Sequence, residues 1–174
     1  MPPPAPSTKP IPRLRACAGF TLLELAIVIV IMGMITSIAI PTYRRIQLNS
    51  RYSVLINDFR VMTSAFQQYY AVNAKWPANS VAKNTLPTGM NEYLRQTNWE
   101  RPTVFGGYYN WDYNIKHNGR KVTAAVAVYK AAKSPLTMTA AEMLQFDRKF
   151  DDGNLNTGSF QKGNQNCLLY IIQN

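Results

Sequence analysis

The chain has 174 residues, of which 47% are hydrophobic and 16% charged, and this length suffices for one domain. One apolar stretch near the N-terminus takes up much of the hydrophobic content, which excludes a large separate core. The formal charge of +10 is compatible with nucleic acid, anionic lipid or acidic polymer as partners, but the lysines and arginines are scattered, which favours ordinary solubility.

The first segment is rich in proline, with prolines at positions 2, 3, 4, 6, 10 and 12. Proline lacks the backbone N–H that an α-helix needs and clashes with the preceding turn. Residues 1 to 12 are therefore predicted to form a disordered extension.

The stretch from Phe20 to Ile40 is apolar except for Glu24. As a helix, these 21 residues would be about 31 Å long, which matches a bilayer core of about 30 Å. A carboxylate inside such a helix costs about 2.5 to 3.5 kcal/mol and calls for a partner. If the chain were cut after Gly19, the new ammonium of Phe20 would lie at the depth of Glu24 in a neighbouring copy.

Two other interpretations of this region stay open. Arg13 and Arg15 precede the apolar stretch, and residues 37 to 39 offer a small-x-small cleavage site, as in a secretory signal. The length of the stretch and its glutamate argue against a signal peptide. Glu24 could also stay hydrated at the headgroups and mark the start of the helix, where the helix dipole favours a negative charge.

After Pro41 the pattern becomes amphipathic, and large apolar residues recur at intervals of three and four. They predict one helical face that a globular head covers. This face consists of Leu48, Tyr52, Leu55, Phe59, Met62, Phe66 and Tyr69. Trp76-Pro77 ends the helix, because the residue before proline is disfavoured in the α region. With the apolar stretch, this makes one helix of about 54 residues, roughly 80 Å long.

The remainder is predicted to be a small β-rich head. Residues 78 to 106 are mostly loop, with a helical patch near residues 90 to 95. Alternation then predicts a hairpin whose strands, 107 to 115 and 122 to 128, are joined by a turn at Asn118-Gly119. The single histidine, His117, lies beside this turn and is expected to be a solvated turn residue.

Two more elements follow the hairpin. Thr139 and Glu142 have the spacing of a capping box and predict a short helix through Phe146 or beyond. Residues 167 to 172 are continuously apolar and predict a buried strand beside the hairpin, with Cys167 as a small hydrophobe at its start.

The loop between these elements carries oxygen side chains at alternating positions, which suits a hard cation such as calcium. The candidate ligands are Asp151, Asp152, Asn154 and Asn156. The alternative is a turn held by Asx side chains without metal, because the acidic residue that closes an EF-hand loop is absent. We expect no enzyme, since no phosphate loop, dinucleotide fingerprint, zinc-type spacing or nucleophile elbow occurs.

The segment Gly19-Phe20-Thr21-Leu22-Leu23-Glu24 resembles the N-terminal motif of the type IV prepilin and pseudopilin family. The resemblance implies that a prepilin peptidase cuts after Gly19, that Phe20 is N-methylated, and that Glu24 acts in assembly. It also implies that Gly33 and Pro41 soften the helix. The expected fold is α+β, pilin-like, with a long N-terminal helix packed on a small antiparallel β-sheet head.

The resemblance further implies four segments. They are a leader over residues 1–19, a transmembrane and filament-core helix over 20–41, its amphipathic continuation over 42–76, and a globular head over 77–174. The precursor would cross the bacterial inner membrane once with a cytoplasmic N-terminus. The mature chain would join copies of itself or other pilins, through inner-membrane assembly machinery, in a periplasmic or cell-surface filament.

The function expected from the resemblance is a structural subunit of a type IV pilus or of a type II secretion pseudopilus. The alternative is a minor pilin whose basic head binds DNA. Cys17 falls in the leader, so Cys167 would be alone in the mature chain, whereas many pilins close a C-terminal loop with two cysteines. Major pseudopilins lack that disulfide and hold a C-terminal loop with calcium, which favours the calcium interpretation.

Overall fold

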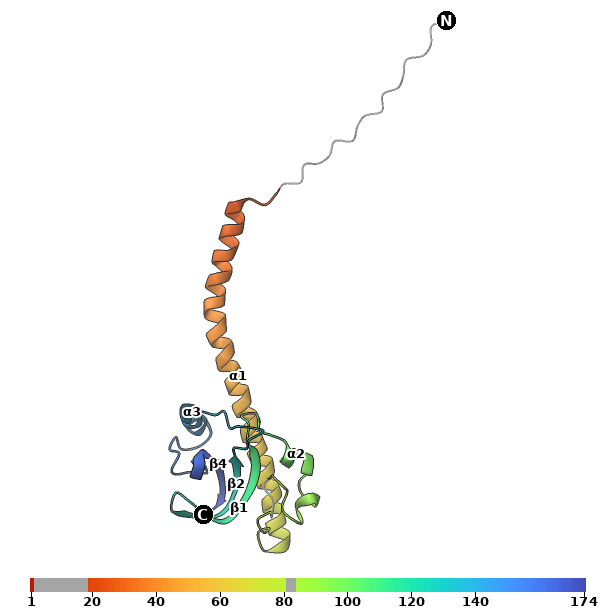
Figure 1. Cartoon of the computed structure of the whole chain (residues 1–174), viewed down its shortest axis with the longest axis vertical. Coiled ribbons are helices and arrows are strands. Elements are labelled where there is room, and N and C mark those ends of the chain that lie inside the picture. Colours follow the sequence, from red (N-terminus) through yellow and green to blue (C-terminus); the bar gives the residue numbers. More distant parts are fainter. Residues whose placement is uncertain (2–18, 81–83) are drawn as a thin grey trace. The chain divides into compact units, whose positions relative to one another are not determined.

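The computed structural model describes residues 1, 19–80 and 84–174 (Figure 1). One long helix, α1 (Leu22–Asn73), precedes an antiparallel sheet of four strands in the order β1-β2-β4-β3. The strands are β1 (Tyr108–His117), β2 (Arg120–Tyr129), β3 (Phe160–Lys162) and β4 (Leu168–Gln173). The shorter helices are η1 (Met90–Glu92), α2 (Gln96–Glu100), α3 (Ala140–Phe150) and η2 (Asn164–Asn166). The predicted α+β class is confirmed.

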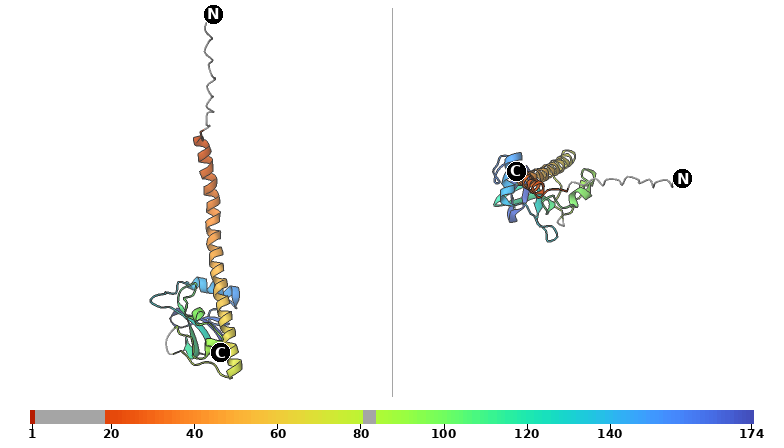
Figure 2. Two further views of the ribbon diagram at one scale, coloured as in Figure 1. Left: turned by 90° about the vertical axis from the view of Figure 1, so that its right-hand side faces the viewer. Right: turned by 90° about the horizontal axis from the view of Figure 1, so that it is seen from above.

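The chain divides into two compact units, Met1–Arg44 and Arg45–Asn174. The second unit contains the hydrophobic core, to which the C-terminal half of α1 contributes one face. Figure 2 shows this half of α1 beside the strands and short helices of the head in two further views. The first unit contains the N-terminal half of α1, whose apolar side chains are exposed.

The predicted stripe on α1 is confirmed as the face that enters the core. Its five central members are buried, and Leu48 and Tyr69 are partly buried against them. Aromatic rings join the helix to the sheet: Phe66 stacks on Trp111 with ring centroids 3.9 Å apart, and Phe59 stacks on Tyr170 at 5.1 Å. Such ring pairs bury a large apolar area and fix the helix against the sheet.

The predicted hairpin is also confirmed. Strand β1 pairs antiparallel with β2, and Trp111 lies opposite Val126. Asn118 and Gly119 take φ angles of 49° and 81°, the positive values that a two-residue primed turn requires. On β2, Val126 and Val128 belong to the main core, whereas Ala125 and Ala127 are buried in separate clusters. Both faces of β2 are therefore covered.

The expectation that His117 is solvated was wrong, since its residue surface is only 3% exposed. The segment between β3 and β4 covers the end of the hairpin and buries the histidine. Asn164 accepts a hydrogen bond from the Asn118 N–H at 2.8 Å, and the Asn164 N–H donates to His117 Nδ1 at 3.4 Å. This contact joins residues more than forty positions apart, so the local sequence around the turn contains no sign of it.

The capping box at Thr139 and Glu142 is confirmed, and α3 continues to Phe150. The predicted C-terminal strand is confirmed as β4, which pairs antiparallel with β2, although it begins at Leu168 instead of Cys167. The helical patch predicted near residues 90 to 95 is the short η1, and α2 follows it. The three-residue strand β3 was not predicted, because it is too short to show a period.

Asp58 lies on the buried face of α1 with 9% of its surface exposed, and the hydrophobic pattern gave no sign of it. Its Oδ1 accepts a hydrogen bond from Arg101 Nη2 at 2.6 Å, and its Oδ2 accepts one from the Tyr109 hydroxyl at 2.7 Å. Burial and the neighbouring Asp58 carboxylate raise the pKa of Tyr109, which therefore remains a donor. The carboxylate thus connects the helix to α2 and β1.

Replacing Asp58 with alanine should destabilise the head by about 1 to 3 kcal/mol, because the buried Tyr109 hydroxyl loses its acceptor. Arg101→Ala should cost less, since 46% of the arginine side chain is exposed and solvent screens its ion pair with Asp58. Thermal unfolding of the full-length protein in detergent, followed by tryptophan fluorescence, measures both changes. Equal losses for the two variants would contradict the assigned role of the Tyr109 hydrogen bond.

Candidate functional site

The N-terminal half of α1 exposes its apolar side chains all round. Leu22 is 90% exposed, Ile29 60% and Ile38 72%, and no residue of its most apolar stretch is buried. This helix has the length and composition to cross a membrane, a test that a signal sequence near the N-terminus also passes. It is not the core helix of a soluble protein, because such a helix would be mostly buried.

Glu24 is held at the first turn of this helix by a reciprocal pair of contacts with Thr21. The Thr21 N–H donates to Glu24 Oε2 at 2.9 Å, and the Glu24 N–H donates to the Thr21 hydroxyl oxygen at 3.2 Å. This is capping-box geometry, with Thr21 in the capping position and Glu24 three residues later. Within one chain, the carboxylate therefore does mark the start of the helix.

The contacts with Thr21 do not use the whole carboxylate. The hydrogen bonds from the Thr21 backbone and hydroxyl both go to Oε2, and no described residue donates to Oε1. Glu24 is exposed in the single chain, so a second partner could approach it. The cap and an intermolecular ion pair are therefore compatible in geometry.

Gly19 and Phe20 lie just before α1 and are both exposed. A Cβ placed on Gly19 would have no atom within 4 Å, so the fold itself does not require glycine there. The bond between them is accessible to a protease. Residues 2–18, which include Cys17 and most of the predicted leader, lie outside the described residues.

Gly33 and Pro41 both lie inside α1, where each is unfavourable for a helix. A Cβ on Gly33 would also meet nothing within 4 Å, so packing within the chain does not explain the glycine. Pro41 cannot donate a hydrogen bond to the carbonyl one turn before it, although α1 continues through this position. Their predicted role in helix flexibility stays a prediction.

The predicted calcium loop contains Asx turns. Asp152 Oδ1 accepts from the Asn154 N–H at 2.8 Å, and Asn154 Oδ1 accepts from the Asn156 N–H at 3.2 Å. Asp151 Oδ2 accepts from the Phe160 N–H at 2.7 Å and so connects the loop to β3. The hydrogen bonds to Asp152, from Thr157 and from Asn154, lower its pKa and keep it ionised.

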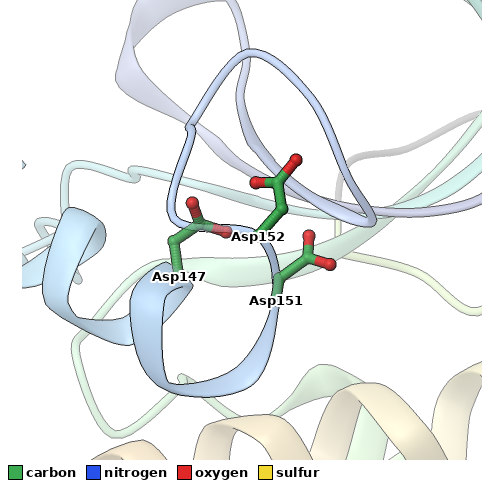
Figure 3. A group of neighbouring side chains, drawn as sticks. All are labelled: Asp147, Asp151 and Asp152. Carbon is green, nitrogen blue, oxygen red and sulfur yellow. The ribbon is translucent and has the colours of Figure 1, made fainter.

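The structure brings Asp151 and Asp152 together with Asp147, which the sequence analysis missed (Figure 3). Asp147 precedes Asp151 by one helical turn, and that spacing of four residues was the signal available in the sequence. Burial, followed by the charges of Asp151 and Asp152, raises the pKa of Asp147 to about 6. Three acidic side chains thus share the C-terminal end of α3.

A second polar cluster surrounds Asp112 on the sheet. Its Oδ2 lies 2.9 Å from His117 Nε2 and accepts a hydrogen bond from the Tyr129 hydroxyl at 2.7 Å, and Cys167 is buried nearby. Burial raises the pKa of the Cys167 thiol to about 12, so the reactive thiolate does not form at neutral pH. The Asp112 carboxylate, on β1, thus connects to Tyr129 at the end of β2.

The family comparison matches residues 14–40, which contain Gly19, Phe20 and Glu24, to the prokaryotic N-terminal methylation motif. Among curated proteins, the chain is 38% identical over 108 residues to the type IV major pilin protein PilE1 of Neisseria gonorrhoeae, covering 60% of this chain and 66% of the relative. The chain is a member of the type IV prepilin and pseudopilin family. The Thr21 to Glu24 cap thus lies within the prepilin motif.

The chain also resembles relatives from both branches of the family. It is 36% identical over 76 residues to the fimbrial protein EcpC of Eikenella corrodens, covering 44% of this chain and 50% of the relative. It is 30% identical over 76 residues to the type II secretion system core protein G of Klebsiella michiganensis, covering 44% and 54%. The matches to these three relatives thus span about half to two thirds of their length.

Among solved structures, the chain resembles the major type IV pilin PilA1 of Clostridium difficile, with a TM-score of 0.50 and 15% identity. The match covers 73% of this chain and 97% of that one. At this identity the likeness supports the fold alone. None of the relatives described here is named for DNA binding, so that alternative gains no support.

Proposed function

We propose that this chain is a structural, non-enzymatic subunit of a filament, either a type IV pilus or a type II secretion pseudopilus. The observation that supports this most directly is the exposed apolar half of α1, which starts with the prepilin motif. Burying one such leucine or isoleucine contributes about 1.5 to 3 kcal/mol, so lipid must cover this surface before assembly and other subunits after it.

The proposal includes processing and location. Prepilin peptidase cuts between Gly19 and Phe20, and Phe20 is then N-methylated. The precursor crosses the bacterial inner membrane once, with its N-terminus in the cytoplasm. Inner-membrane assembly machinery then moves the mature subunit into a periplasmic or cell-surface filament, where it packs against copies of itself or other pilins. Surface fibres that disappear when the chain is deleted would distinguish a pilus from a pseudopilus.

Replacing Gly19 with valine should leave the uncut precursor in the membrane. A protease needs close access to the scissile backbone, and a side chain with a Cβ obstructs that approach. The substitution should not disturb folding, because a Cβ at Gly19 meets no atom within 4 Å. Mass spectrometry of membrane fractions from both strains measures processing. A wild-type N-terminus other than methylated Phe20 would overturn the assignment of the cut.

The proposed role of Glu24 is to pair with the Phe20 ammonium of an adjacent subunit. Opposite charges about 4 Å apart attract by several kcal/mol even at an effective dielectric near 20. This attraction offsets the cost of the carboxylate in the membrane and favours one stagger of neighbouring helices. The cap with Thr21 leaves Oε1 without a donor among the described residues, so both contacts can exist together.

Glu24→Ala should therefore reduce the yield of sheared filaments by about tenfold or more, since each 1.4 kcal/mol corresponds to about a factor of ten. Membrane insertion should be as good as in the wild type or better, because the buried charge is gone. The measurement compares mature protein in membrane fractions with protein in sheared filaments.

Two further variants separate pairing from capping. Glu24→Gln retains an acceptor for the Thr21 N–H, as a capping box allows, but it has no charge. Thr21→Ala removes the cap and keeps the charge. Pairing predicts failed assembly for Glu24→Gln and near-normal assembly for Thr21→Ala. The reverse result would leave Glu24 as a helix cap alone.

A further inference from the structure

We propose that the heads of neighbouring subunits contact each other through the two ends of α3, where a basic pocket on one copy receives the acidic cluster of the next. The acidic cluster consists of Asp147, Asp151 and Asp152 at the C-terminal end of the helix. The basic pocket lies at the N-terminal end and carries Lys130 and Lys162. The inference rests on the proposed filament function, since it names a partner surface for that assembly.

The basic pocket has a volume of about 290 Å³ and lies between the end of β2, the start of α3 and the segment after β3. Its lining includes Met138 and Met143, which are 5% and 3% exposed. Lys130, also in the lining, is exposed, and Lys162 is half-buried. Buried apolar groups beside exposed polar ones are the usual composition of a protein contact, with its apolar centre and polar rim.

Neither ammonium group of the pocket has an anionic partner within the described ranges, 19–80 and 84–174. The ion pairs there involve Asp58 and Asp112, both elsewhere in the head. Glu142, in the first turn of α3, uses its carboxylate to accept from the Thr139 N–H and hydroxyl group. The positive charge of the pocket is therefore available to another molecule.

The acidic cluster has an uncompensated charge of the opposite sign. One oxygen of each carboxylate lies within 4.8 Å of the others, and Figure 3 shows the three gathered where α3 passes into the following loop. Asp147 is 0% exposed, and neither of its oxygens has a hydrogen-bond partner among the described residues. The adjacent Arg148 forms no ion pair with the cluster in that part of the chain. A positive group beside the cluster would favour its ionised form.

Asp152 is the member of the cluster that another molecule reaches most easily, because it is exposed. Its carboxylate accepts from the Asn154 N–H and from the Thr157 hydroxyl, and these hydrogen bonds orient it and lower its pKa. A carboxylate offers about four acceptor sites, so a lysine of another copy can still bind. Hydrogen bonds between an ammonium and a carboxylate are among the stronger ones in proteins.

The two surfaces lie at opposite ends of one helix, and their charges have the same signs as its dipole. With 11 residues, α3 is about 16 Å long. The dipole places a partial positive charge at the N-terminal end, beside the basic pocket, and a partial negative charge at the end with the acidic cluster. A contact between two different surfaces leaves one of each free on the pair, so it can repeat along a filament.

The proposed occupant of the pocket is a second copy of the chain, because every copy supplies both complementary surfaces. Opposite charges across an interface fix its register and exclude wrong arrangements more than they add affinity. The apolar half of α1 would contribute most of the buried area in the filament. The contact at α3 would then determine how neighbouring heads are placed around it.

The first test reverses one charge on each surface and measures protein in sheared filaments. Lys130→Glu and Asp152→Lys should each lower the yield by about tenfold or more, because like charges then meet at the contact. The double variant Lys130→Glu with Asp152→Lys should recover most of the yield, since the pair is present again with its signs exchanged. Both side chains are exposed in the single chain, so folding should change little.

Lys133→Glu is the matched control for Lys130→Glu. Lys133 is exposed and lies outside the pocket, and its replacement changes the net charge by the same amount. This variant should form filaments in wild-type yield. Asp152→Asn keeps an acceptor for the Asn154 N–H and should reduce the yield less than Asp152→Lys. Equal amounts of mature protein in membrane fractions of all variants would separate assembly from folding and processing.

The second test determines the direction of the contact with two introduced cysteines. Ala140→Cys places a thiol at the basic pocket and Arg148→Cys places one beside the acidic cluster, and both positions are exposed. On α3 they are about 12 Å apart, beyond the roughly 7 Å limit of a disulfide within one chain. Oxidised filaments of the double-cysteine variant should give a ladder of dimers, trimers and longer chains on a denaturing gel. Each single-cysteine variant should give monomers.

Several results would overturn the proposal. They are normal filaments in Lys130→Glu or Asp152→Lys, a double variant as defective as the single ones, and a gel with dimers alone, which a two-fold contact would produce. If a free cation compensates the cluster instead, Lys130→Glu should assemble normally. Absence of filaments in the wild type would overturn the proposed filament function itself, so the two failures are distinguishable.

Discussion

The exposed apolar half of α1 is the constraint on which the rest of the molecule depends. One continuous helix has to satisfy two environments, since its first half exposes leucine, isoleucine and valine all round and its second half buries a single aromatic face. A fully apolar helix is stable in lipid or inside a protein assembly, and an amphipathic one is stable against a core. The pattern changes near Pro41. The first half of α1 therefore suits lipid or a protein assembly, and the second half suits the core of the head.

Under the proposed pairing, Glu24 serves the single chain as a helix cap and the filament as one partner of an ion pair. At the first turn of an isolated helix, its carboxylate accepts from the Thr21 backbone N–H, which has no acceptor within the helix. In an apolar environment, the same charge becomes expensive unless a cation approaches it, and the proposed ammonium of a neighbouring Phe20 is such a cation. The cap would then orient the carboxylate before assembly.

The sequence predicted those parts of the fold that depend on local patterns. The stripe on α1, the Asn118-Gly119 turn and the Thr139 cap each need residues at most a few positions apart, and all three were confirmed. The burial of His117 was not predictable in this way, because it depends on Asn164 from a distant segment. Asp58 was missed for the same reason, since its partners Arg101 and Tyr109 come from other elements.

The same distinction between local patterns and contacts of distant segments applies to the candidate sites. The processing and assembly residues, Gly19, Phe20 and Glu24, form a linear motif that the sequence shows directly. Their proposed roles depend on other molecules, a peptidase and a neighbouring subunit. The acidic cluster needs a helix end and a turn to bring Asp147 beside Asp152, and the alternating pattern of the loop included just two of its three members.

Three buried carboxylates in the head differ in how their charge is compensated. Asp58 has Arg101 and Tyr109 as donors, and Asp112 has His117 and Tyr129, so protein groups compensate both charges. Asp147 is as deeply buried as either, yet no group in the described chain donates a hydrogen bond to it. Burial, together with the charges of Asp151 and Asp152, disfavours the ionised form of Asp147 and raises its pKa to about 6. The apolar half of α1 differs from these carboxylates, because its exposed leucine, isoleucine and valine side chains have no cover within the described chain and need lipid or other protein surfaces around them.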